Sequence, residues 1–453
     1  MTGPSTAPRD AWATRAGFIL AAVGSAVGLG NMWRFAYKAS EGGGAAFVVL
    51  YVVIVALVGI PLMTSEFVIG RLAQESPARA VRRLGGSAWG PLGWLFILCG
   101  VGILSYYSVI AGWTMRYAFD AVRNVIPSDT SAYFGEVATG WDAVGYHLLF
   151  MLLTVGVVAG GVKGGLERGN LIMMPLLFLI LIGLAIWAAT LPGGGPGYAY
   201  YLRPSLDRLL DVDTLTRAAG QSFFSLSLGM GALMTYASYL KSKENLAREA
   251  VIVALSDTGV AMTAGLIVFP VMFNFGLDSQ ITQIGDSTVG ALFITLPRGF
   301  EQLGRAGDYI DAAFFVMLFF AALTSAISLL EVVVAAMVDG IGVSRRNAAT
   351  AGGALIALLG LPAAFNTTFL GNLDTLVGQF LLMLGGLLTA ILVGYRLLPQ
   401  ADAELTKGLH VDWLRHAWAF LVRYVAPVVL IVVLVFLAKP TWNAVVGLVT
   451  FAR

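Results

Sequence analysis

Glycines and oxygen-bearing side chains gather inside the first apolar segment, where a simple membrane helix would carry few of either. Three glycines fall within seven residues, at Gly24, Gly28 and Gly30. Asn31 follows directly, and Arg34 comes three residues later. In hydrocarbon an unpaired backbone group costs several kcal/mol, so a broken helix persists only where protein or a water-filled cavity surrounds it. We therefore expect this helix to break near residues 26–30 and to offer its freed carbonyls and amides to a polar or charged ligand.

A structural alternative exists for the glycines, because small residues also let membrane helices pack closely. That alternative would be preferred if Gly17 and Gly24 were the only unusual residues. Asn31 and Arg34 favour a functional site, since polar groups inside a span need partners and usually serve function.

A later apolar segment has the same character. Residues 221–231 mix the hydroxyls of Ser222, Ser225 and Ser227 with Gly229 and Gly231. Two glycine-interrupted helices in corresponding positions indicate a transporter site at the interface of two inverted repeats.

The elements that would position these residues are membrane helices. The 453 residues are 58% hydrophobic and 12% charged, whereas soluble domains carry about 25% charged residues. This composition predicts a polytopic membrane protein without a sizeable soluble domain. One cysteine and three histidines exclude an internal disulfide and argue against a cysteine- or histidine-rich metal site. The sequence contains no basic cluster of the kind that would indicate nucleic-acid binding.

Stretches of about 20 apolar residues predict spans. They form eleven groups, at about 12–37, 43–70, 90–124, 143–160, 168–190, 215–240, 248–275, 309–338, 348–363, 374–398 and 419–448. Arginine and lysine concentrate before the first span and after the second, sixth and eighth. Cytoplasmic loops carry such an excess, so we expect the N-terminus inside and the C-terminus outside.

Several motifs are recognisable at this point. They are Trp12-Ala13-Thr14-Arg15, Gly28-Leu29-Gly30-Asn31-Met32-Trp33-Arg34-Phe35, Gly59-Ile60-Pro61-Leu62, Gly70-Arg71, Phe223-Phe224-Ser225-Leu226-Ser227-Leu228-Gly229 and Leu323-Thr324-Ser325. Together they resemble the neurotransmitter:sodium symporter family, most closely its bacterial amino-acid transporters. The resemblance implies an all-α polytopic membrane protein with eleven transmembrane helices in one domain, 1–453. Helices 1–5 (12–190) would form one repeat, helices 6–10 (215–398) its inverted copy, and 419–448 helix 11, with helices 1 and 6 broken.

The function implied is sodium-coupled symport of a hydrophobic or aromatic L-amino acid into the cell by alternating access, at the plasma membrane. An amino-acid sensor or channel on the same scaffold is the alternative, although neither tail is long enough for a signalling domain. An enzyme is not expected, because no nucleophile, base or metal cluster assembles and His147, His410 and His416 lie near loops. The oligomeric state stays open.

Two sodium sites are implied by the resemblance. The first would use the Ala26 carbonyl, the side chains of Asn31, Ser225 and Asp257, and the substrate carboxylate. The second would use the carbonyls of Gly24, Val27 and Ala321 with the hydroxyls of Thr324 and Ser325. Either hydroxyl alone could simply bond to the preceding helical turn, but the adjacent pair within the family motif favours sodium.

The substrate site implied by the resemblance has a polar end and an apolar end. Its residues would be Ala26, Leu29, Gly30, Ile103, Tyr107, Phe224, Ser225, Ser227, Met230, Ser325 and Leu329. Family members that carry amines without a carboxylate have aspartate at the position of Gly28. Glycine here implies a substrate that brings its own carboxylate, which positive helix ends would favour.

The resemblance also implies two gates and a fixed negative charge. Arg34 and Asp374 would form the outer gate. The inner gate would comprise Arg9 and Asp339 with Trp12 and Tyr239, while Glu66 would bridge backbone amides of the broken helices. Asp257 would replace the chloride of animal members, so transport should be chloride-independent. An incidental, solvated aspartate is the structural alternative. Glu331 has no role assigned from the sequence.

Overall fold

Backbone breaks and long apolar helices dominate the computed structural model, which describes residues 10–240, 244–277 and 291–451. Every regular element within those residues is helical. Nine helical runs there are long and apolar enough to cross a membrane, and a bent helix pair would make a tenth. The predicted all-helical membrane fold is therefore confirmed.

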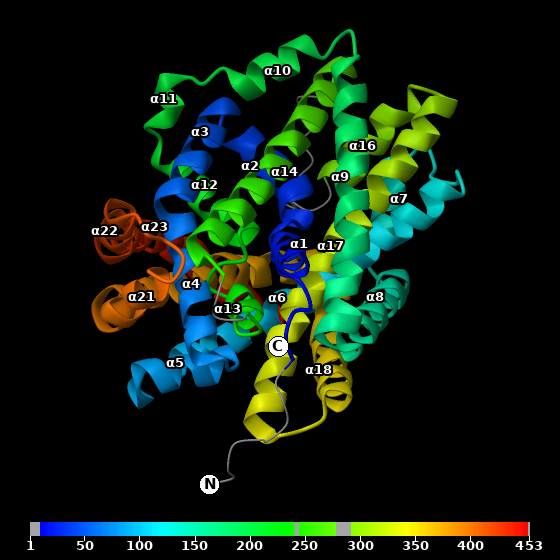
Figure 1. Ribbon diagram of the computed structural model, residues 1–453. Coiled ribbons are helices and arrows are strands. Elements are labelled where there is room, and N and C mark those ends of the chain that lie inside the picture. Colours follow the sequence, from blue (N-terminus) through cyan, green and yellow to red (C-terminus); the bar gives the residue numbers. More distant parts are fainter. Residues whose placement is uncertain (1–9, 241–243, 278–290, 452–453) are drawn as a thin grey trace.

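The elements in chain order carry the labels of Figure 1, with η for short π-helical or 3-10 segments. They are α1 (Arg15–Ala26), η1 (Gly30–Arg34), α2 (Phe35–Glu41), α3 (Ala45–Ile54), η2 (Val55–Gly59), α4 (Ile60–Ala73), α5 (Pro77–Gly85), η3 (Ser87–Trp89), α6 (Gly90–Val122), α7 (Thr130–Ala138), α8 (Trp141–Ala159), η4 (Val162–Glu167), α9 (Arg168–Ala189), α10 (Gly195–Leu202), α11 (Leu206–Leu209), α12 (Val212–Ser225), α13 (Ala232–Ala237), α14 (Leu246–Asn274), α16 (Ala291–Glu301), α17 (Arg305–Ile341), α18 (Arg345–Phe365), α19 (Thr367–Leu373), η5 (Asp374–Leu381), α20 (Leu382–Ile391), η6 (Leu392–Leu397), α21 (Leu398–Leu405), α22 (Asp412–Phe420), η7 (Leu421–Val425) and α23 (Ala426–Phe451).

The first helix breaks where its glycines and asparagine predict. Helix α1 ends at Ala26, and Val27 turns to an extended ψ of 105°. Helical winding resumes at Gly30, and the two parts are bent by 57°. The residues between them leave backbone groups outside the helical ladder.

The second break separates α12 from α13 over residues 226–231. Ser227, Gly229 and Gly231 have φ values of 54°, 75° and 76°. Glycine adopts such left-handed conformations at little cost, so Gly229 and Gly231 allow the chain to turn here. Ser227, a residue that rarely takes positive φ, is held by a hydrogen bond from its hydroxyl to the Ser25 carbonyl (2.8 Å).

The broken helix α1–α2 lies in the middle of the bundle, beside α9, α14 and α17 (Figure 1). The short helices α10 and α11 cross one end, and α5 lies toward the other. The apolar window of Arg305–Ile341 is 78% buried, whereas those of Val162–Ala189 and Asp412–Phe451 are only 33% buried. The latter two helices therefore expose the most apolar surface, as helices that contact lipid or another protein do.

Four predicted spans are too narrow at both ends. Those predicted at 309–338 and 348–363 extend over Arg305–Ile341 and Arg345–Phe365, and the last two differ by more. The run predicted at 374–398 extends over Thr367–Leu405, and the one predicted at 419–448 extends over Asp412–Phe451. Their extra turns hold polar residues that a hydrophobicity pattern excludes. Arg415, for example, pairs with Asp402 at 2.8 Å. Short loop helices such as α5, α7 and α16 were also not predicted.

Candidate binding site

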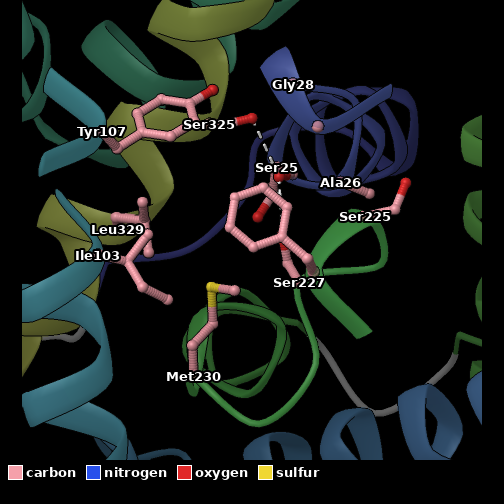
Figure 2. A pocket seen from close by; sticks show the side chains of 12 residues that line it. Ser25, Ala26, Gly28, Ile103, Tyr107, Ser225, Ser227, Met230, Ser325 and Leu329 are labelled. Carbon is pink, nitrogen blue, oxygen red and sulfur yellow. Dashed lines mark hydrogen bonds between the residues drawn. The ribbon is translucent and has the colours of Figure 1, made fainter. Parts of the chain in front are cut away.

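A cavity of about 330 Å³ lies at the two helix breaks (Figure 2). Its lining residues are Ser25, Ala26, Gly28, Gly30, Ile103, Tyr107, Phe224, Ser225, Ser227, Met230, Ser325 and Leu329. The structure thus brings together ten of the predicted substrate residues. Leu29, also predicted, contributes its amide, which donates to the Tyr107 hydroxyl at 3.2 Å.

The polar end of the cavity is built from the break in α1. The Gly28 amide donates to Asn31 Oδ1 at 2.9 Å. A Cβ on Gly28 would collide with the Ser325 hydroxyl and lie 3.0 Å from the Tyr107 hydroxyl. Glycine is therefore the residue that lets these two hydroxyls reach the broken backbone.

The opposite end of the cavity is apolar. Figure 2 shows Ile103 and Leu329 side by side, with Met230 across from them. Phe224 lies partly buried at the same cavity. A ligand with one charged end and one hydrophobic end would match this division, since apolar pockets with a few placed polar groups fix a ligand's orientation.

Ser25 is a lining residue that sequence reasoning missed. Its carbonyl accepts from Ser227 Oγ at 2.8 Å, and from Ser325 Oγ at 3.2 Å. Its hydroxyl donates to Ser328 at 2.8 Å. The only available signal was its place beside the expected break.

The first oxygen cluster comprises Ala26, Asn31, Ser225 and Asp257. Asn31 Nδ2 donates to Ser225 Oγ at 3.0 Å and to Asp257 Oδ1 at 2.6 Å. Ser225 Oγ donates to the other carboxylate oxygen at 2.8 Å, and Tyr51 approaches that oxygen at 3.2 Å. Asp257 is fully buried. The structural alternative of a solvated aspartate is therefore wrong.

The second oxygen cluster comprises the carbonyls of Gly24, Val27 and Ala321 with the hydroxyls of Thr324 and Ser325. Ser325 Oγ lies 3.3 Å from the Gly24 oxygen and 3.2 Å from the Val27 oxygen. Thr324 Oγ1 lies 3.0 Å from the Ala321 oxygen and 3.5 Å from that of Val27. The Thr324 hydroxyl also bonds back to its own helix at Phe320, 3.1 Å away. All five groups are hard oxygen donors, which suit a small hard cation.

An ion pair and an aromatic ring close one side of the cavity. Arg34 Nη2 lies 3.2 Å from Asp374 Oδ2, and Tyr106 donates to the other Asp374 oxygen at 2.8 Å. The Arg34 guanidinium carbon lies 4.3 Å from the centre of the Phe224 ring. The predicted pair is thus in contact, with Phe224 between Arg34 and the cavity.

At the N-terminal end of α1, Trp12 packs against Tyr236 and Tyr239. Its indole donates to the Tyr236 carbonyl at 2.9 Å, and its ring lies 6.3 Å from that of Tyr239. Arg9 lies outside the described residues. Asp339 accepts from the Ser76 amide at 2.6 Å, so the structure connects it to the segment before α5.

Glu331 has partners that the sequence could not assign. It is fully buried, and its carboxylate accepts from the Tyr239 hydroxyl at 2.6 Å. Arg345 pairs with its other oxygen and also reaches Asp10 at 3.2 Å. Glu331 therefore connects the turn after α13 to the start of α18.

Glu66 on α4 meets the break in the sixth predicted span. Its Oε1 accepts from the Gly229 amide at 2.8 Å. A backbone amide freed by the break is thereby satisfied. The expected contact with the first broken helix is not among the hydrogen bonds of the described residues, in which Glu66 Oε2 is buried without a partner.

Comparison with known proteins agrees with this geometry. A model of the sodium:neurotransmitter symporter family matches residues 9–135 and 136–446. The chain belongs to this family. This family consists of transporters.

Relatives of the symporter match nearly its whole length. A sodium-dependent transporter of Methanocaldococcus jannaschii is 36% identical, with 93% of this chain and 89% of the relative covered. A sodium-dependent transporter of Bacillus subtilis is 34% identical, covering 93% and 96%. The crystal structure of MhsT in complex with L-phenylalanine has a TM-score of 0.87 and 38% identity, and the match covers 94% of the symporter and 99% of MhsT.

Proposed function

We propose that this symporter carries a hydrophobic or aromatic L-amino acid into the cell, driven by sodium entry. The observation that carries the proposal is the cavity's division into a polar end at the helix 1 break and an apolar end at Ile103, Met230 and Leu329. The likeness to MhsT, crystallised with L-phenylalanine, supports the substrate class. Alternating access would expose this cavity to each side of the membrane in turn.

The two oxygen clusters would hold two sodium ions, which travel as cargo with the amino acid. Both clusters combine backbone carbonyls freed by the break in α1 with side-chain oxygens from other helices. In the first cluster the substrate carboxylate would complete the set, which would couple amino-acid binding to sodium binding. The fixed carboxylate of Asp257 would make chloride unnecessary.

The substrate carboxylate would meet the backbone amides near Leu29 and Gly30 and the hydroxyl of Tyr107. Helix N-termini favour anions because their first amides lack partners within the helix. The substrate amine would meet carbonyls of Ala26 and Phe224. Arg34 with Asp374 would gate the outer side, and Arg9 with Asp339 the inner side.

Competition for uptake tests this proposal. Leucine and phenylalanine should compete for sodium-driven uptake in vesicles, whereas isoamylamine and phenethylamine, their decarboxylated forms, should not. Losing a charged carboxylate that accepts several hydrogen bonds costs about 3 kcal/mol or more of binding free energy. The inhibition constants of the amines should therefore be roughly 100-fold higher. Equal inhibition by the amines would overturn the role of the carboxylate.

The span count follows if α12 and α13 together form one broken span. With α1–α2 and the nine long runs this makes eleven, arranged as two inverted repeats and a last helix. A reporter enzyme fused after Arg453 should then be active only outside the cytoplasm, and one fused at the arginine-rich segment around α5 only inside. The reverse pattern at Arg453 would show an even number of spans.

A further inference from the structure

An unpartnered amide oxygen lies beside the second oxygen cluster. Asn170, on the first turn of α9, is fully buried. Its Nδ2 donates to the Leu166 carbonyl at 2.9 Å, while its Oδ1 has no hydrogen-bond partner. The Leu166 carbonyl can only accept, so the amide nitrogen must face it and the oxygen must point the other way.

That oxygen points at Gly24, whose carbonyl belongs to the second oxygen cluster. A Cβ on Gly24 would collide with Asn170 Oδ1, and would lie 3.1 Å from Met174 Sδ and 3.2 Å from the Cβ of Thr324. Glycine at position 24 thus allows the amide oxygen to approach the backbone of α1, and Thr324 packs against the same glycine.

Buried acceptors without a partner are costly and usually have an explanation. Asn170 Oδ1 finds no donor among the described residues, and the other atoms nearest the Cβ position of Gly24 are the Met174 thioether and the Thr324 Cβ. A cation held by the adjacent carbonyls and hydroxyls would supply the missing positive partner.

The turn that carries Asn170 is fixed firmly to α1. Glu167, three residues earlier, accepts from the Ala13 amide at 2.8 Å and from the Thr14 hydroxyl at 2.7 Å. A Cβ on Gly17 would collide with Glu167, just as one on Gly24 would collide with Asn170. The start of α9 is therefore held against both ends of α1, which positions Asn170 with little freedom.

We propose that Asn170 supplies an additional oxygen to the second sodium site and raises the affinity of that site for Na⁺. This inference rests on the proposed function, because it requires sodium at the second oxygen cluster. The fifth predicted span, which contains α9, would then also contribute a ligand to the second sodium ion.

Sodium titration of purified protein in detergent tests the proposal, with thermal stability and binding of labelled phenylalanine as readouts besides uptake. Asn170→Leu keeps the side-chain volume and removes the oxygen, so the sodium concentration for half-saturation should rise about tenfold. Asn170→Asp adds a negative charge and should lower it. Met174→Leu, which alters another neighbour of Gly24 without changing any oxygen, should leave it unchanged.

A double-mutant cycle places the effect at the second site. In a Thr324→Ala background, Asn170→Leu should add little further loss, whereas independent effects would add in full and contradict the proposal. Equal sodium dependence in wild type, Asn170→Leu and Asn170→Asp would also overturn it. A wild-type protein that shows no response to sodium would instead refute the proposed function itself.

Discussion

Replacing both Thr324 and Ser325 with alanine should abolish sodium-driven uptake while leaving the protein folded in detergent. The two hydroxyls supply the side-chain oxygens of the second oxygen cluster, and both lie on the fully helical α17. Losing two oxygens at about 1.5–3 kcal/mol each would weaken sodium binding by about 100- to 20,000-fold. Uptake of labelled leucine or phenylalanine at a series of sodium concentrations measures this loss.

A matched control exists in two other buried threonines. Thr154 and Thr389 bond back to the carbonyls four residues earlier, at 2.9 and 2.8 Å. Thr154→Ala with Thr389→Ala removes two buried hydroxyls of that kind from other helices and should leave the sodium dependence intact. Normal uptake by the Thr324/Ser325 variant would refute the second sodium site.

The second large effect concerns Asp257. Wild-type uptake should continue when gluconate replaces chloride, because this buried carboxylate would balance the charge of the proposed first sodium. Asp257→Asn removes that charge yet keeps the shape of the side chain. Removing one partner of a buried charge pair costs about 3–5 kcal/mol, so uptake without chloride should fall by about 100-fold or more. Added chloride should bind next to Tyr51 and Ser225 and restore part of the uptake.

Asp311→Asn is the control for this substitution. Asp311 is also a buried aspartate on a long helix, but it lines a separate cavity together with Asp308 and Glu301. Its loss should not change the chloride dependence. A wild-type protein that requires chloride would contradict the assignment, as would full chloride-free activity of Asp257→Asn.

Breaks in the helices were predictable because they depend on local chemistry. Glycines next to Asn31, and serines next to Gly229, conflict with a continuous helix in hydrocarbon. The structure breaks both helices at these positions. The lining of the cavity could be predicted only through the resemblance, because no periodicity relates Ile103 to Met230 or Leu329.

Contacts between distant polar residues could not be predicted. Glu331 contacts Tyr239 in the turn after α13 and Arg345 at the start of α18, and the sequence contains no pattern that pairs them. Asn170 looks like any polar residue of a membrane helix until the structure shows that its oxygen lacks a partner. Such pairings depend on how helices pack, which is decided by shape over the whole bundle.

The position of the Phe224 ring should decide which ligands are transported and which only inhibit transport. Arg34, which pairs with Asp374, also packs on this ring, with its guanidinium carbon 4.3 Å from the ring centre. A side chain too bulky for the cavity would act as a wedge, lifting the ring and separating arginine from aspartate. Such a molecule would bind from outside and stall the cycle. The size of the ligand side chain would therefore decide whether a bound molecule is transported or inhibits. The decision would fall when the Arg34–Asp374 pair closes, after the molecule has bound.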